Sequence, residues 1–103
     1  MRGNIQQLPK KLIGEAEERY FEPFTQTHLR FLPYIFHLAI NDKVLEPAKI
    51  NEDEKQIYLF MKKELGVIEG SITQPIKFID KRFYDFVCEC LWYAYNNTFE
   101  SEE

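Results

Sequence analysis

The chain has 103 residues, of which 45% are hydrophobic and 16% aromatic, and its formal net charge is −4. This length fits one domain, and the composition excludes an intrinsically disordered chain, because disorder goes with few apolar residues and high charge. The negative charge argues against broad, sequence-independent binding to nucleic acid, which requires a basic face.

No apolar run approaches the ~18 residues that a membrane span needs, and the N-terminal segment lacks the apolar core of a secretory signal. The two cysteines are free thiols of the kind expected in a reducing compartment. We therefore expect a cytoplasmic protein with no membrane partner. It should form a single domain over residues 1–103, with 1–7 and 100–103 disordered.

The first predicted helix covers residues 9–21. Pro9 suits a first helical turn, and Leu12, Ala16 and Tyr20 follow at four-residue steps that place them on one face. Gly14 interrupts this helix at a cost of about 1 kcal/mol relative to alanine. We expect that cost to be offset by a close contact with another helix.

Thr25 or Thr27 can cap a second helical region, in which Pro33 is the difficulty. Proline removes a backbone hydrogen bond and disfavours helical angles at the residue before it. We therefore expect a short turn before Pro33 and a main helix over 33–41, with an extension to Leu45 left open. His37 lies among apolar neighbours and is predicted to be a hydrogen-bonded packing residue and not a ligand or base, whereas His28 is predicted at the surface near a cap.

The third helix, over residues 52–65, has the clearest signals. Asn51 is a good N-cap, Glu54 occupies the reciprocal capping position, and Gly66 provides a left-handed C-terminal exit. The following segment, 66–79, is compatible with a small hairpin or with an irregular loop. In either case Val67, Ile68 and Ile72 should reach the core, and Pro75 argues against a long second strand.

The last helix begins after Asp80, a good N-cap, and Asn96 and Asn97 can end it. Apolar side chains surround most of its girth, and only a narrow strip is polar. We expect the other segments to pack around it. The predicted fold is therefore an all-α single domain in a four-helix bundle-like arrangement, with the 66–79 excursion before the C-terminal helix.

The sequence contains no catalytic, nucleotide-binding or metal-binding motif. The chain lacks the glycine-rich phosphate loops, the G-x-S-x-G elbow and the H-E-x-x-H zinc motif. Cys88 and Cys90 are about 200° apart on a helix, so a zinc site with His28 and His37 is disfavoured against buried free thiols. Asp85 and Glu89 are one turn apart and could do acid–base chemistry in a cleft, but a solvated strip is the more ordinary reading. We expect no enzyme activity, no cofactor and no metal.

Two features stand above background. Trp92 and Tyr93 lie beside the polar strip that carries Asp85 and Glu89, and a large aromatic at the edge of a wet face suits a protein interface. The alternative is that the first helix or the C-terminal tail covers Trp92. The second feature is a group of basic residues that flank the 66–79 segment and could contact phosphates. These are Lys62, Lys63, Lys77, Lys81 and Arg82.

The sequence thus predicts a small non-enzymatic protein that binds another protein through aromatic surface, as an adaptor, assembly factor or inhibitor. We also expect self-association, because the last helix is so apolar. Small size, acidity and aromatic richness would suit a phage or mobile-element product. The alternative function is a DNA-binding transcriptional regulator that uses the basic-flanked 62–82 region, although the order of its elements differs from the usual winged arrangement.

Overall fold

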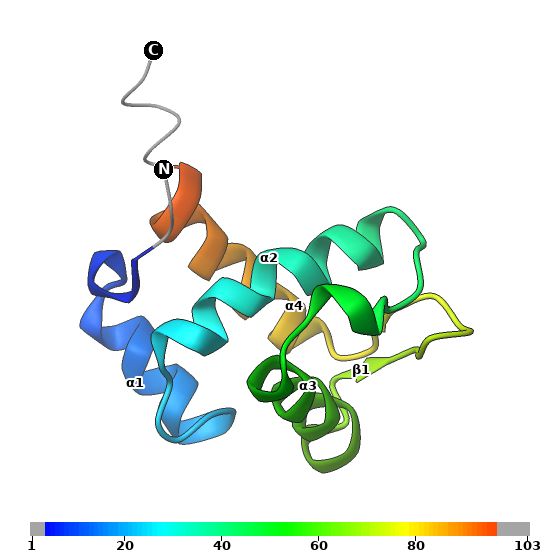
Figure 1. Ribbon diagram of the computed structural model, residues 1–103. Helices are drawn as coiled ribbons and strands as arrows, with labels where there is room; N and C mark the ends of the chain where they lie inside the picture. Colours follow the sequence, from blue (N-terminus) through cyan, green and yellow to red (C-terminus); the bar gives the residue numbers. More distant parts are fainter. Residues whose placement is uncertain (1–3, 97–103) are drawn as a thin grey trace.

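The computed structural model describes residues 4–96, and Figure 1 shows its ribbon. These described residues are mostly helical, at 65%, with four α-helices and a small two-stranded antiparallel sheet. The helical class is therefore confirmed in outline, with a strand pair added. The four-helix bundle arrangement stays a prediction.

A capped turn precedes the first helix, within the segment that we expected to be disordered. The backbone amide of Asn4 donates to Gln7 Oε1 at 3.1 Å, and the Gln6 amide donates to Asn4 Oδ1 at 2.8 Å, which closes a 3₁₀ turn over Ile5–Gln7. The Ile5 amide donates to Gln26 Oε1 at 2.8 Å. These bonds join residues 4–7 to the start of the second helix. Residues 1–3 and 97–103 lie outside the described part.

Helix α1 spans Lys10–Arg19 and begins after Pro9, close to the predicted start. Its Leu12 and Ala16 are buried as expected. The expectation for Gly14 was wrong: a Cβ atom built there would meet no atom within 4 Å, and the residue is exposed. Gly14 therefore makes no close helix contact, and nothing in the structure offsets its cost in helix propensity.

Helix α2 spans Gln26–Ile40 without a break, so the predicted start at Pro33 was wrong. Thr25 caps the helix through its bond to the His28 amide. Proline costs roughly 3 kcal/mol inside a helix, but Leu29 and Leu32 are fully buried, and each contributes about 1.5–3 kcal/mol. Tertiary burial on the turns before Pro33 therefore outweighs the local penalty.

The C-terminal end of α2 also excludes the extension to Leu45. Asn41 Nδ2 donates to the His37 carbonyl oxygen at 2.9 Å, and Asp42 adopts a left-handed φ of 57°. These two residues close the helix and turn the chain. His37 is hydrogen-bonded as predicted, with Nδ1 3.1 Å from Asn41 Nδ2, but its side chain is exposed, so the predicted packing role was wrong.

Helix α3 spans Glu52–Leu59 and continues as a π-helical turn over Phe60–Leu65, which together match the predicted 52–65. The Asn51–Glu54 capping box is present, with bonds of 2.8 and 3.0 Å, and Gly66 has a left-handed φ of 64°. The π turn itself was not predicted.

The 66–79 segment is a hairpin. Strand β1, Ile68–Glu69, pairs with β2, Lys77–Phe78, in the register Ile68↔Phe78 and Glu69↔Lys77. Val67 and Ile68 are buried as predicted, but Ile72 is 58% exposed and Ile76 takes the core position instead. The reason is an anchor outside the hairpin: the Ile76 amide donates to the Lys43 carbonyl at 2.9 Å.

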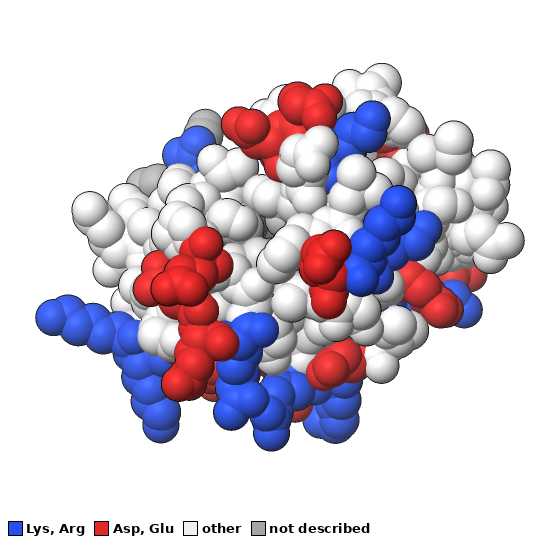
Figure 2. All heavy atoms as spheres, turned by 90° about the horizontal axis from the view of Figure 1, so that it is seen from below, with Lys and Arg blue, Asp and Glu red and all other residues white. Residues whose placement is uncertain are grey.

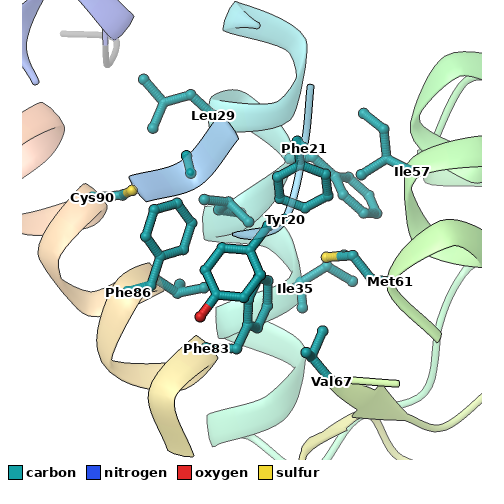
Figure 3. Packing of buried hydrophobic residues seen from close by; sticks show 14 of the residues in the cluster. Tyr20, Phe21, Leu29, Ile35, Ile57, Met61, Val67, Phe83, Phe86 and Cys90 are labelled. Carbon is teal, nitrogen blue, oxygen red and sulfur yellow. The ribbon is translucent and has the colours of Figure 1, made fainter. Parts of the chain in front are cut away.

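Helix α4 spans Lys81–Leu91 and continues as a π turn over Trp92–Asn96. Asp80 caps it, accepting from the Phe83 amide at 3.0 Å. Phe83, Phe86 and Cys90 are buried, and Figure 3 shows the two phenyl rings against Tyr20 from the end of α1. The Tyr20 ring centroid lies 4.9 Å from each of them.

The centre of the fold is α2 and not α4, which corrects our expectation. Helix α2 packs against α3, α4 and β2, and it crosses the middle of the molecule in Figure 1. Leu29, Leu32 and Ile35 on it are fully buried. Helix α4, in contrast, leaves one broad face exposed. Among the described residues, no helix combines the length and the apolar character needed to cross a membrane.

Candidate functional site

The exposed face of α4 carries three of the four residues predicted for an interface. Asp85, Glu89 and Trp92 follow one another at spacings of four and three residues, so they share a face, and all three are exposed. Trp92 opens the π turn and is 44% exposed, so the alternative that the first helix covers it is wrong, and the tail lies outside the described residues. Tyr93 is half-buried and packs against the core. The structure therefore separates Tyr93 from the other three.

The two carboxylates of this face are solvated. Asp85 Oδ2 lies 3.0 Å from Lys81 Nζ, in an exposed ion pair between residues one helical turn apart. An exposed pair of this kind contributes little, about 0.3–0.5 kcal/mol. General acid–base chemistry requires a group whose pKa is tuned by burial or by close charges. Asp85 and Glu89 are exposed, which agrees with the predicted solvated strip.

The five basic residues around the hairpin do not form one cluster. Lys63 borders a hollow with Phe60, whereas Lys62 borders a hollow at the hairpin loop, and Arg82 borders a third one beside α1. Lys77 borders the hairpin-loop hollow and also a fourth hollow, which it shares with Lys81. In Figure 2, blue and red side chains are interspersed across the face seen from below Figure 1. This placement adds no support to the DNA-binding alternative, which stays a prediction.

Cys90 and His28 have structural roles, because both side chains pack into the fold. Cys88 and Cys90 are free, and burial raises the pKa of the Cys90 thiol to about 12. His28 Nδ1 accepts from the Thr25 amide at 3.1 Å, and burial lowers the pKa of this half-buried imidazole. Its ring centroid lies 4.6 Å from that of Phe21. The predicted position of His28 near the cap is confirmed by its bonds to Thr25, but the side chain is half-buried because its ring packs on the aromatic core. No group of three or more metal-ligating side chains occurs in residues 4–96.

A second apolar surface was missed by the sequence analysis. It is a hollow between the end of α2, strand β2 and the start of α4, lined in part by Ile40, Phe78, Ile79 and Tyr84. Ile40 is 60% exposed, Ile79 is 54% exposed and Tyr84 is 37% exposed. We call this surface the isoleucine hollow. No local pattern predicts it, since its residues come from three separate elements.

Aromatic packing holds the floor of the isoleucine hollow. The Tyr84 ring stacks on Phe36 with centroids 6.0 Å apart, and it meets Phe78 edge-on at 5.4 Å. Tyr84 and Cys88 are also hydrogen-bonded, and this bond is the main cause of the raised pKa of the Tyr84 phenol. The ring is therefore held in place on a surface that stays open.

A third apolar surface is a hollow between the α1–α2 connection and α3. Phe60, at the start of the first π turn, is 39% exposed and faces it, together with Phe21 and His28. The Phe21 and Phe60 centroids are 6.0 Å apart. Both π turns thus begin with an exposed aromatic residue, Phe60 in one and Trp92 in the other.

Comparison of the chain with protein-family models, with curated proteins and with solved structures found no match. The functional argument therefore depends on the surfaces described above.

Proposed function

We propose that this chain is a small non-enzymatic protein that binds another protein through aromatic surface, as an adaptor, assembly factor or inhibitor in the cytoplasm. The observation that carries the proposal is the exposed indole of Trp92 on α4. Tryptophan buries a large area at small conformational cost, which makes it a frequent energetic centre of interfaces.

The surroundings of Trp92 support this reading. Asp85 and Glu89 lie on the same face and are exposed, so the indole would form an apolar centre with a polar rim beside it, as protein interfaces do. The two carboxylates favour a partner with basic groups at the edge of the contact. The half-buried Tyr93 next to the indole packs on the core and so anchors the backbone that presents Trp92.

The experiment is capture of a partner by the tagged protein from cells that naturally contain it, followed by reconstitution with the purified partner. We expect Trp92→Ala to weaken binding at least tenfold, because a central tryptophan is worth ~2 kcal/mol or more at an interface. Phe60→Ala is the matched control, since Phe60 is a comparably exposed aromatic residue at the start of the other π turn.

Circular dichroism must first show that both variants fold as the wild type does. If Trp92→Ala binds the reconstituted partner as tightly as the wild type, the proposed surface is wrong. If Phe60→Ala loses binding and Trp92→Ala does not, the interface lies at α3 instead.

A further inference from the structure

We propose that the isoleucine hollow is a self-association surface, which a second copy of this chain covers in a weak two-fold dimer. This surface lies at the N-terminal end of α4, whereas Trp92 lies two turns beyond Tyr84 towards the C-terminal end. The inference therefore goes beyond the proposed function and does not depend on it.

The apolar part of the hollow is unusual for a surface that stays in water. Ile40 and Ile79 expose more than half of their area, and Tyr84 exposes over a third. They come together from the end of α2, the residue after β2 and the first turn of α4. Scattered single apolar residues need no explanation, whereas adjacent exposed apolar residues with a polar rim favour a contact site. The fixed Tyr84 ring means that little side-chain freedom is lost on binding.

The charges at the rim identify the occupant. Asp42, Asp80, Lys77 and Lys81 border the hollow, so its rim carries two groups of each sign, and Lys81 already forms an exposed ion pair with Asp85. A two-fold interface brings the same patch from each copy together, and it must therefore be complementary to itself. A rim that carries both signs can meet its own copy with Lys77 facing an aspartate of the other copy.

Of the neighbouring hollows, two carry unequal charges. The Phe60 hollow is bordered by Glu22, Glu64 and Lys63, and copies meeting there would bring an excess of carboxylates together. The hollow beside α1 has three cations, Lys11, Arg19 and Arg82, against two carboxylates. The hairpin-loop hollow has two groups of each sign, Lys62 and Lys77 with Asp42 and Glu69, but its lining contains no isoleucine. The hollow that includes Ile72 is also neutral, with Glu52 and Lys55 at its edge. It is the rival surface, and it supplies the controls.

The predicted dimer is weak. Stable interfaces bury about 800 Å² on each partner, whereas three partly exposed side chains form only the centre of such an area. We therefore expect a reversible monomer–dimer equilibrium, in which the dimer fraction rises with protein concentration. Sedimentation velocity and light scattering up to about 1 mM protein cover the range of weak affinities.

The central test compares Ile79→Arg with Ile72→Arg. Both isoleucines are exposed to nearly the same degree, 54% and 58%, and both lie in the hairpin region. Surface substitutions of this kind usually change stability by less than about 0.5 kcal/mol, and circular dichroism checks the fold. We expect Ile79→Arg to remain a monomer at concentrations where the wild type and Ile72→Arg associate.

A second pair of variants tests whether the charges at the rim control association. Lys77→Glu leaves three acidic groups and one basic group at the rim, and it should weaken association at least tenfold. Lys55→Glu changes the net charge of the chain by the same amount at the rival hollow and should leave association unchanged. Equal weakening by both variants would mean that overall charge, and not the rim, controls association.

A wild-type chain that stays monomeric over the whole concentration range would overturn the proposal. Loss of association in Ile72→Arg but not in Ile79→Arg would also overturn it, because the rival hollow would then be the interface. Trp92→Ala should dimerise as the wild type does. A dimer that persists in Trp92→Ala, together with lost partner capture, would separate the two surfaces.

Discussion

Two buried tyrosines should respond in opposite directions to the same chemical change, the removal of a hydroxyl group. The Tyr20 hydroxyl is buried and has no hydrogen-bond partner among the described residues. Burial, followed by the nearby Asp80 carboxylate, raises the pKa of this phenol. The Tyr58 hydroxyl, in contrast, donates to the Gly70 carbonyl oxygen at 2.6 Å.

The expected magnitudes follow from these environments. An unsatisfied buried polar group costs about 1–3 kcal/mol, so Tyr20→Phe should raise the free energy of unfolding by ~1 kcal/mol. The ring contacts with Phe83 and Phe86 are kept, because the phenyl ring remains. Tyr58→Phe loses a hydrogen bond and leaves the Gly70 carbonyl unsatisfied, so it should lower the free energy of unfolding by about 2 kcal/mol.

Urea unfolding at pH 7, followed by circular dichroism, measures both changes. For a domain of this size, 1 kcal/mol also corresponds to a shift of roughly 4–8 °C in Tm. If Tyr20→Phe destabilises the protein by 1 kcal/mol or more, its hydroxyl has a hydrogen-bond partner and the reasoning fails. Changes of the same sign in the two variants would refute the claim that the environment decides the outcome.

The remaining predictions concern pH, glycines and thiols. The pKa of the Cys90 thiol is about 12 in the folded protein and close to 8.5 in the unfolded chain. The contribution of the buried neutral thiol to the free energy of unfolding is therefore complete below pH ~8.5 and is lost as the pH rises above it, by about 1.4 kcal/mol per pH unit. Cys90→Ala should flatten this slope in urea unfolding between pH 8 and about 10.5, and an unchanged slope would contradict the prediction. Gly70→Ala should destabilise the protein by ~1–3 kcal/mol, because φ at Gly70 is 118° and a Cβ atom there would lie 2.5 Å from the Pro75 carbonyl oxygen. Gly14→Ala should stabilise it by about 1 kcal/mol, because a Cβ atom at Gly14 would meet no other atom within 4 Å. Thermal unfolding compares the two variants, and the reverse order of stability would show the assigned backbone to be wrong. Half-buried Cys88 should react with a thiol reagent before buried Cys90 does, and mass spectrometry of the singly modified protein should place the label on Cys88 and not on Cys90.

The placement of functional side chains shows where sequence reasoning stops. Trp92 was expected at a surface because it lies on the same helical strip as Asp85 and Glu89, and a strip follows from helical geometry alone. The isoleucine hollow had no such signal. Ile40 and Ile79 are nearly forty positions apart, and each one alone reads as another core residue. Only the path of the chain around α2 leaves both of them uncovered.

The sequence by itself determined the helix boundaries that depend on neighbours within about four positions. Asn51 with Glu54, Asp80 with the Phe83 amide, and Gly66 at the end of the third helix act through bonds that form wherever the local backbone is helical. Only the tertiary structure decided that α2 continues through Pro33, that Ile76 and not Ile72 reaches the core, and that α2 lies at the centre of the fold. The physical reason is that burial energy depends on segments distant in the chain, and here it exceeds the local preferences that a sequence pattern records.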